Sequence, residues 1–142
     1  MMNPLSLVVT LMASAILTAA GLPFVLAEIH SARLSALESD IGKIEQAGAA
    51  YGRANGTYNG ISCPALASEG FWPTNGCSGA NFVLTELPAT SVTISATNPQ
   101  TFNENVSTTY YVPDELTRVC NAWGPKSDGC TVSPGSVVLT FQ

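Results

Sequence analysis

The chain begins with a long stretch in which nearly every side chain is apolar. Residues 1–27 contain no Asp, Glu, Lys or Arg, and the first charged residue is Glu28. Asn3–Pro4 is typical of a helix start, since Asn can cap a helix and Pro suits its first turn. At about 1.5 Å per residue such a helix spans roughly 40 Å, more than the bilayer core of about 30 Å. We therefore predict an apolar helix over 1–27 that must be buried in lipid or against other subunits.

Beyond this segment the pattern changes to a single apolar stripe. The stripe follows alternating steps of three and four residues, as on one face of a helix, and consists of Ala27, His30, Leu34, Leu37, Ile41, Ile44, Gly48 and Tyr51. The polar face is predicted to carry Glu28, Arg33, Glu38, Asp40, Lys43 and Glu45. The spacing of Asp40 and Lys43 suits a weak ion pair. We expect the same helix to continue over 28–54, to end near Gly52–Gly56 and to pack its stripe on its own domain.

A Gly and a Pro interrupt the apolar helix near its outer end, at Gly21–Leu22–Pro23. Pro inside a helix removes a hydrogen bond and clashes with the preceding turn, and Gly weakens the same turn. A plain membrane anchor does not need such a break, whereas a helix that bends or unwinds on assembly does. The sequence therefore predicts a helix break at these residues in an assembled form.

The residue pattern of 55–142 is typical of a small domain made of loops and strands. Alternating apolar and polar positions predict strands at Phe82–Leu87, Thr90–Thr97, Ser107–Val112 and Ser136–Phe141. Pro88–Ala89 is expected to form a turn, and Pro113 is expected to open a short helical turn. The predicted fold class is α+β, with a long hydrophobic N-terminal helix packed on a small antiparallel sheet of about four strands.

Four cysteines, Cys63, Cys77, Cys120 and Cys130, lie in this domain. An even number of cysteines behind an apolar segment indicates disulfides formed in an oxidising compartment. Three pairings are possible. We favour Cys63–Cys77 and Cys120–Cys130, because each closes a short loop that contains Gly or Pro. The spacings are too long for a zinc site of the C-x2-C type, and the single His is far from every Cys.

The charge pattern and the reactive residues argue against several functions. The net charge is −5 and the five basic residues are dispersed, which disfavours nucleic-acid binding. The single His, His30, lies on the membrane-proximal helix, so no base is expected near a Ser or Cys nucleophile. Asp114–Glu115 is typical of helix-start acids. We expect no cofactor, no metal and no enzymatic activity.

Three segments resemble the type IV pilins and the related pseudopilins. Ala19–Pro23 is similar to the end of the pilin apolar segment, where a Pro follows a run of small residues. Ala49–Tyr58 resembles the family's exit from the long helix, which reads Tyr, a few residues, then Asn-Gly-x-Tyr. Cys120–Cys130 resembles the C-terminal disulfide-bounded loop, and the long helix-to-sheet loop suits the type IVb branch. Pilins usually carry a glutamate at the fifth mature position, where this chain has Leu5, or Ser6 if Met2 is the first mature residue.

The resemblance implies a structural subunit of an extracellular filament, held in the inner membrane before the pilus assembly machinery adds it to a helical homopolymer. The helix core would be packed through Leu7, Leu11, Ala13, Ser14, Ala19 and Ala20, whose small members allow close helix approach. Two alternatives remain. One is a monomeric membrane-anchored periplasmic or extracellular binding module, and the other is a pseudopilin of a secretion system. The filament's task, whether adhesion, motility, DNA uptake, conjugation or secretion, does not follow from the subunit plan.

Overall fold

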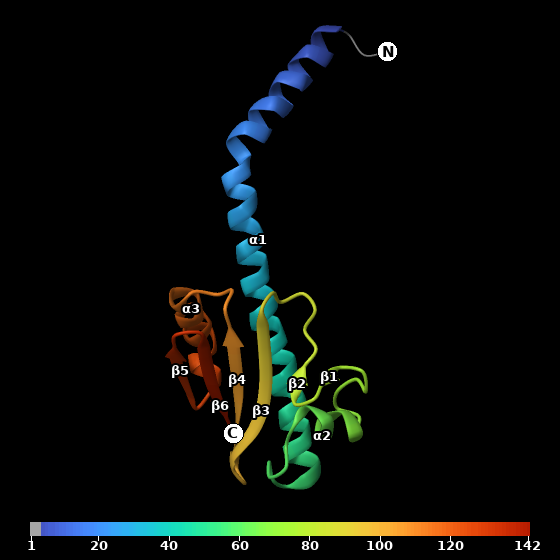
Figure 1. The fold of residues 1–142 in the computed structure, drawn as a ribbon, viewed down its shortest axis with the longest axis vertical. Coiled ribbons are helices and arrows are strands. Elements are labelled where there is room, and N and C mark those ends of the chain that lie inside the picture. The colour runs from blue at the N-terminus through green and yellow to red at the C-terminus, as the bar shows by residue number, and fades with distance from the viewer. Residues whose placement is uncertain (1–3) are drawn as a thin grey trace. The chain divides into compact units, whose positions relative to one another are not determined.

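The computed structural model describes residues 4–142, and for residues 4–28 and 30 it describes only the backbone, which is helical. The chain forms two compact units, Met1–Arg33 and Leu34–Gln142. The first long element, α1, runs from Pro4 to Asn55 and so contributes to both units (Figure 1). Among the described residues, no helix is both long enough and apolar enough to cross a membrane. The predicted apolar packing surface of 1–27 lies outside the side chains that the structure describes.

The second half of α1 supplies one side of the core of the 34–142 unit. The predicted stripe is buried from Leu34 onward: Leu37, Ile41 and Ile44 are fully inaccessible to solvent. Helix and sheet approach closely at Gly48, where an added Cβ would lie 2.7 Å from the Phe102 ring. The helix ends at Asn55, as the Gly52–Gly56 signal predicts, and Gly56 takes the left-handed conformation.

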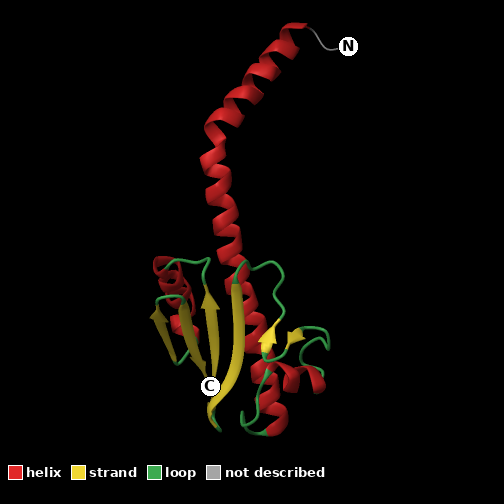
Figure 2. Ribbon diagram, in the orientation of Figure 1, coloured by secondary structure: helices red, strands yellow, loops and turns green. Residues whose placement is uncertain are grey.

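A four-stranded antiparallel sheet packs on this half of the helix (Figure 2). Its spatial order is β3-β4-β6-β5, and the bounds are β3 Thr90–Asn98, β4 Thr101–Thr108, β5 Gly129–Ser133 and β6 Ser136–Phe141. Every second residue of β4 and of β6 is buried. One face of the sheet therefore forms the core with α1, which confirms the α+β class and the antiparallel pairing.

Smaller elements flank the sheet on both sides. On the β3 side lie α2, Cys63–Ser68, and a two-stranded sheet of β1, Cys77–Ser78, and β2, Asn81–Phe82 (Figure 1). On the β5 side lies α3, Pro113–Trp123, followed by the 3-10 helix η1, Gly124–Lys126. The Val112 N–H donates to Glu115 Oε1 at 3.0 Å, which satisfies a free donor at the start of α3.

Several predicted elements differ from the observed ones. The predicted strand Phe82–Leu87 is wrong, because only Asn81–Phe82 pairs and the chain then turns away. The predicted strand Ser107–Val112 is displaced: β4 begins at Thr101 and ends at Thr108. The sequence did not predict β5 or α2. The segment at Pro113, where a short helical turn was expected, is an eleven-residue helix. Glu104 conceals β4, since it stands between Phe102 and Val106 at a position where the alternation calls for an apolar residue.

The two disulfides join Cys63 to Cys77 and Cys120 to Cys130, the pairs that the loop lengths favoured. The first ties α2 to β1, and the second ties α3 to β5. The first therefore stabilises the flanking region on the β3 side internally, and the second holds α3 to the edge strand of the sheet. Both act at the periphery, where a small core offers the least support.

We expect Gly48→Ala to destabilise the domain by about 1–3 kcal/mol, although Ala is the better helix former. The new methyl group would meet the fully buried Phe102 ring at 2.7 and 2.9 Å, and Ile94 at 3.1 Å. Gly42→Ala is the matched control, because its nearest neighbours are atoms of the half-buried Trp123 at 3.2 and 3.3 Å. Chemical denaturation of both variants checks this, and equal stabilities would contradict the close helix–sheet approach.

We also expect reduction of the full chain in detergent to lower its melting temperature substantially. Loops with sequence separations of 14 and 10 residues are each worth about 3 kcal/mol in the chain-entropy model. Paired Cys→Ser variants, made separately for each disulfide, divide the effect between the two flanking regions. Superimposable melting curves with and without reductant would exclude a stabilising role.

Candidate functional site

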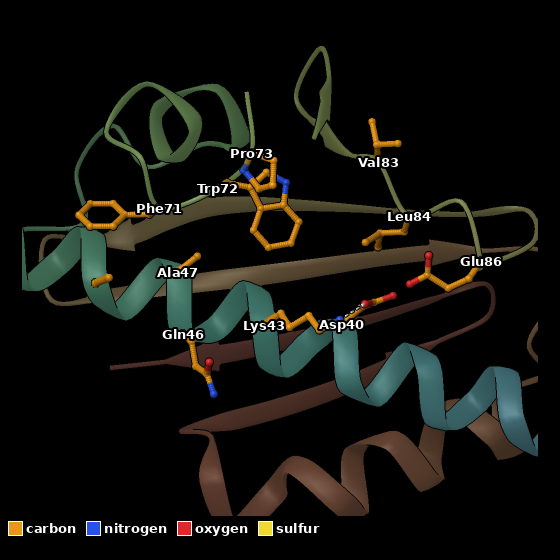
Figure 3. Close-up of a pocket in the computed structure, with 11 residues that line it drawn as sticks. Asp40, Lys43, Gln46, Ala47, Phe71, Trp72, Pro73, Val83, Leu84 and Glu86 are labelled. Atoms are coloured by element: carbon orange, nitrogen blue, oxygen red, sulfur yellow. Dashed lines mark ion pairs between the residues drawn. The ribbon is translucent and has the colours of Figure 1, made fainter. Parts of the chain in front are cut away.

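A groove lies between α1 and the loops that precede β3. Its volume is about 610 Å³. One wall comes from α1, and the other comes from the loop after α2 and the segment after β2 (Figure 3). Apolar lining residues are Ala47, Phe71, Trp72, Val83 and Leu84, and charged ones are Asp40, Lys43 and Glu86. The groove is therefore an apolar trough with acidic groups at one end.

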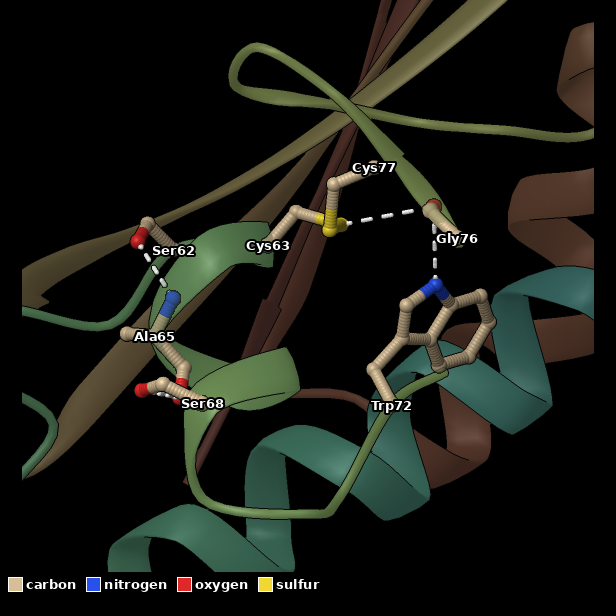
Figure 4. Close-up of a disulfide and its surroundings, with 7 residues drawn as sticks. All are labelled: Ser62, Cys63, Ala65, Ser68, Trp72, Gly76 and Cys77. Carbon is tan, nitrogen blue, oxygen red and sulfur yellow. Dashed lines mark hydrogen bonds between the residues drawn. A yellow bond between two sulfur atoms is a disulfide. The ribbon is translucent and has the colours of Figure 1, made fainter. Parts of the chain in front are cut away.

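The first disulfide and a set of local hydrogen bonds hold the loop wall of this groove (Figure 4). Ser62 caps α2 by accepting from the Ala65 N–H at 3.1 Å. Trp72 Nε1 donates to the Gly76 carbonyl at 3.0 Å, and the Trp72 ring meets the Phe82 ring edge-on at 4.9 Å between centroids. The indole is thus fixed by a polar contact on one side and by an aromatic contact on the other.

Two carboxyl groups, Asp40 and Glu86, meet at the acidic end of the groove (Figure 3). Asp40 is 4% exposed, and its Oδ2 has no donor among the described residues. Glu86 is the neighbour of Asp40, and two carboxyls can bond to each other only when one of them is protonated. Burial, followed by the hydrogen bond and the like charge of Glu86, raises the pKa of Asp40 to about 7.

The two acids have opposite shifts, as expected for a pair that shares one proton. The hydrogen bond from Asp40 lowers the pKa of Glu86. Lys43 Nζ lies 3.8 Å from Asp40 Oδ1, which confirms the predicted pairing, but the Lys43 side chain is 65% exposed. Such a distant and solvated ammonium compensates the buried carboxylate only in part.

A third acid, Glu104, is buried in the middle of the domain. It lies on β4 and is completely inaccessible to solvent, and neither carboxylate oxygen has a hydrogen-bond partner among the described residues. Burial and then the nearby charge of Glu45 raise the pKa of Glu104 well above its ordinary value. Burial therefore favours the protonated form of Glu104 in the folded domain.

The structure places the predicted site residues in two groups. The four cysteines are bonded in the described domain. The helix-break residues Gly21, Leu22 and Pro23 lie within α1, which is continuous here. The side chains of the predicted packing residues lie outside those described: Leu7, Leu11, Ala13, Ser14, Ala19 and Ala20. In the described part of the chain, no group of three or more His, Cys, Asp or Glu could hold a metal ion.

The sequence did not predict the two buried acids, Asp40 and Glu104, or the exposed Glu86 beside Asp40. Asp40 was expected on the polar face of α1 and is buried instead, because the loop carrying Glu86 covers it. Glu104 had a detectable signal: it lies two residues from both Phe102 and Val106, so it shares their inward face on any strand. No sequence signal indicated Glu86, since its partner, Asp40, lies on α1, far away in the sequence.

Comparison of the chain with protein-family models, with curated proteins and with solved structures returns no match. Functional reasoning for this chain therefore begins from its own residues and geometry.

We expect Glu104→Leu to stabilise the domain at neutral pH by about 1–3 kcal/mol, because it removes a buried acid without a partner. A raised pKa means that the folded state holds the proton more tightly than the unfolded state does. Glu104 therefore lowers stability progressively as the pH rises above its ordinary value of 4.5. Denaturation at about pH 5 and about pH 8 should show a smaller pH dependence in the variant.

Glu38→Leu is the matched control, since Glu38 lies on the solvent side of α1 and is only half-buried. Its effect should stay within about 0.5 kcal/mol. If Glu104→Leu were destabilising at both pH values while Glu38→Leu was neutral, Glu104 would have a stabilising partner and the account of its burial would fail.

Proposed function

We propose that the chain is a structural subunit of an extracellular filament of the type IV pilin kind. The observation that carries the proposal is that the two halves of the N-terminal helix differ in charge content and in what they pack against. Residues 1–27 carry no charge, whereas the stripe from Leu34 to Tyr51 is already occupied by the chain's own sheet. The charge-free half therefore needs a different partner, and other copies of the same segment can supply it.

The described domain supports the same proposal. A helix packed against one face of an antiparallel sheet, with a disulfide-bounded loop at Cys120–Cys130, is what the pilin resemblance implies. The domain is small, and the second half of α1 is part of its core. Such a domain can be carried on the outside of a bundle of N-terminal helices.

In this proposal, assembly works by packing. Before assembly, the apolar segment is held in the inner membrane. It then leaves lipid, with the help of the assembly machinery, for a bundle of identical helices. Ala13, Ser14, Ala19 and Ala20 permit close helix contacts, and Gly21–Pro23 unwinds to fit the bundle. Contacts between copies are head-to-tail, so they propagate an open helical polymer. No catalytic step is involved.

The groove favours a second candidate, a membrane-anchored binding module or pseudopilin. Its apolar walls and its paired acids are features of a ligand site. In that case the segment 1–27 would remain in the membrane as an anchor, and the domain would act as a monomer. The two candidates differ in whether the intact chain is recovered in fibres.

We expect electron microscopy of material sheared from producing cells to show thin fibres, with this chain identified in them by mass spectrometry. Ala19→Leu with Ala20→Leu should reduce the fibres several-fold, because larger side chains keep the helices apart. The variant chain should remain in the membrane fraction, since Leu is at least as apolar as Ala. Val8→Leu, a change between two large apolar residues in the same segment, is the matched control.

If the chain were found only in membranes, without fibres, the filament proposal would fail and the anchored module would be favoured. Equal fibre yields from the double variant and the control would contradict close packing at Ala19 and Ala20.

A further inference from the structure

The acidic end of the groove is an incomplete binding site. Asp40 Oδ2 is buried, lines the groove and has no donor among the described residues. Glu86 is exposed and faces the same space (Figure 3). When both acids are ionised, two negative charges lie together, and the Lys43 ammonium, 3.8 Å from Asp40 Oδ1 and largely solvated, offsets them in part. A cation with several hydrogen-bond donors would complete the arrangement.

The rest of the groove indicates which kind of cation fits. The trough beyond the acids is walled by Trp72, Phe71 and Leu84, which suit the methylene groups of an aliphatic chain. An indole face also attracts an organic cation. A small, strongly hydrated metal ion would gain nothing from these walls, and two carboxylates fall short of the ligands that Ca²⁺ takes.

We propose that this groove binds an alkylammonium or guanidinium group, with the charge between the Asp40 and Glu86 carboxylates and the aliphatic stem against Trp72 and Leu84. The inference does not depend on the filament. The group can be supplied by a basic side chain of a second copy or by a free amine. Both sources present the same chemistry.

Binding has a proton balance that can be measured. The unliganded pair holds one proton below about pH 7, and the incoming cation displaces it into solvent. An alkylammonium group keeps its own charge throughout this range. The affinity should therefore rise about tenfold per pH unit up to about pH 7 and level off above it. Lys43 and Glu86 are the charged groups that act on Asp40, so no other titration is expected to shape this profile.

The test uses the full chain in zwitterionic detergent, titrated with n-butylammonium chloride against sodium chloride at equal ionic strength. Carbon-13 NMR of the carboxyl groups and Trp fluorescence report binding. We expect saturable binding with the predicted pH profile. Asp40→Asn should weaken it by about tenfold or more, because a charge-assisted hydrogen bond is lost. Glu86→Gln should weaken it and also lower the pKa of Asp40, since the like charge is removed.

Asp114→Asn is the matched control, because it removes one negative charge at an exposed position on α3. It should leave binding unchanged. Equal weakening by Asp114→Asn and Glu86→Gln, or binding without saturation, would show only general attraction to an acidic surface and would overturn the proposal. So would an affinity that does not change between about pH 5 and about pH 7.

A second arm identifies the source of the cation. Carbodiimide treatment of assembled material joins a lysine to a carboxylate in contact with it, and the chain has only Lys43 and Lys126. A cross-link from Lys126 to Asp40 or Glu86 between copies would assign the site to a neighbouring subunit. Butylammonium binding by the dispersed chain, with no such cross-link, would exclude a lysine of a neighbouring subunit and leave a guanidinium group or a free amine as the source.

Discussion

The structure depends on the contact between the second half of α1 and the middle of the sheet. Leu37, Ile41 and Ile44 are fully buried there, and Gly48 lets the helix backbone approach the Phe102 ring. β4 and β6 provide the opposite surface through their alternate residues. This contact uses the entire apolar stripe of 34–51. In the proposed assembly, the charge-free segment before the stripe therefore packs against the same segment of other copies. Fold and proposed assembly therefore follow from the same periodic pattern.

Acidic side chains are buried at two places beside this contact, and each is unusual for a small domain. Glu104 lies inside the core without a partner, whereas Asp40 lies at its margin and shares a proton with Glu86. Burial is the main cause of the raised pKa of both Asp40 and Glu104, but the consequences differ. Glu104 can affect only the stability of the fold, because no ligand reaches it. Asp40 opens onto a groove and can exchange its proton for a cation.

The sequence predicted the parts of the structure that depend on local periodicity or on short loops. The stripe from Leu34 to Tyr51, the helix end at Asn55, the strands β3 and β6 and both cysteine pairs all belong to this class. The boundaries of β4 were predicted poorly, because Glu104 occupies an inward position and breaks the apolar alternation. The groove could not be predicted at all. It requires residues from α1, the loop at Phe71–Trp72 and the segment at Glu86 to meet, and no local pattern specifies that meeting.

We propose that residues 1–27 of many copies pack against one another while each sheet domain stays folded on its own helix. Helical reconstruction of the sheared fibres by cryo-electron microscopy, at a resolution that shows side chains, tests it most directly. The account predicts a bundle of N-terminal helices at the fibre axis, non-helical backbone near Gly21–Pro23, and the sheet domains outside. Fibres whose axis is formed by the sheet domains, or an axial helix that stays unbroken through residues 18–24, would contradict it.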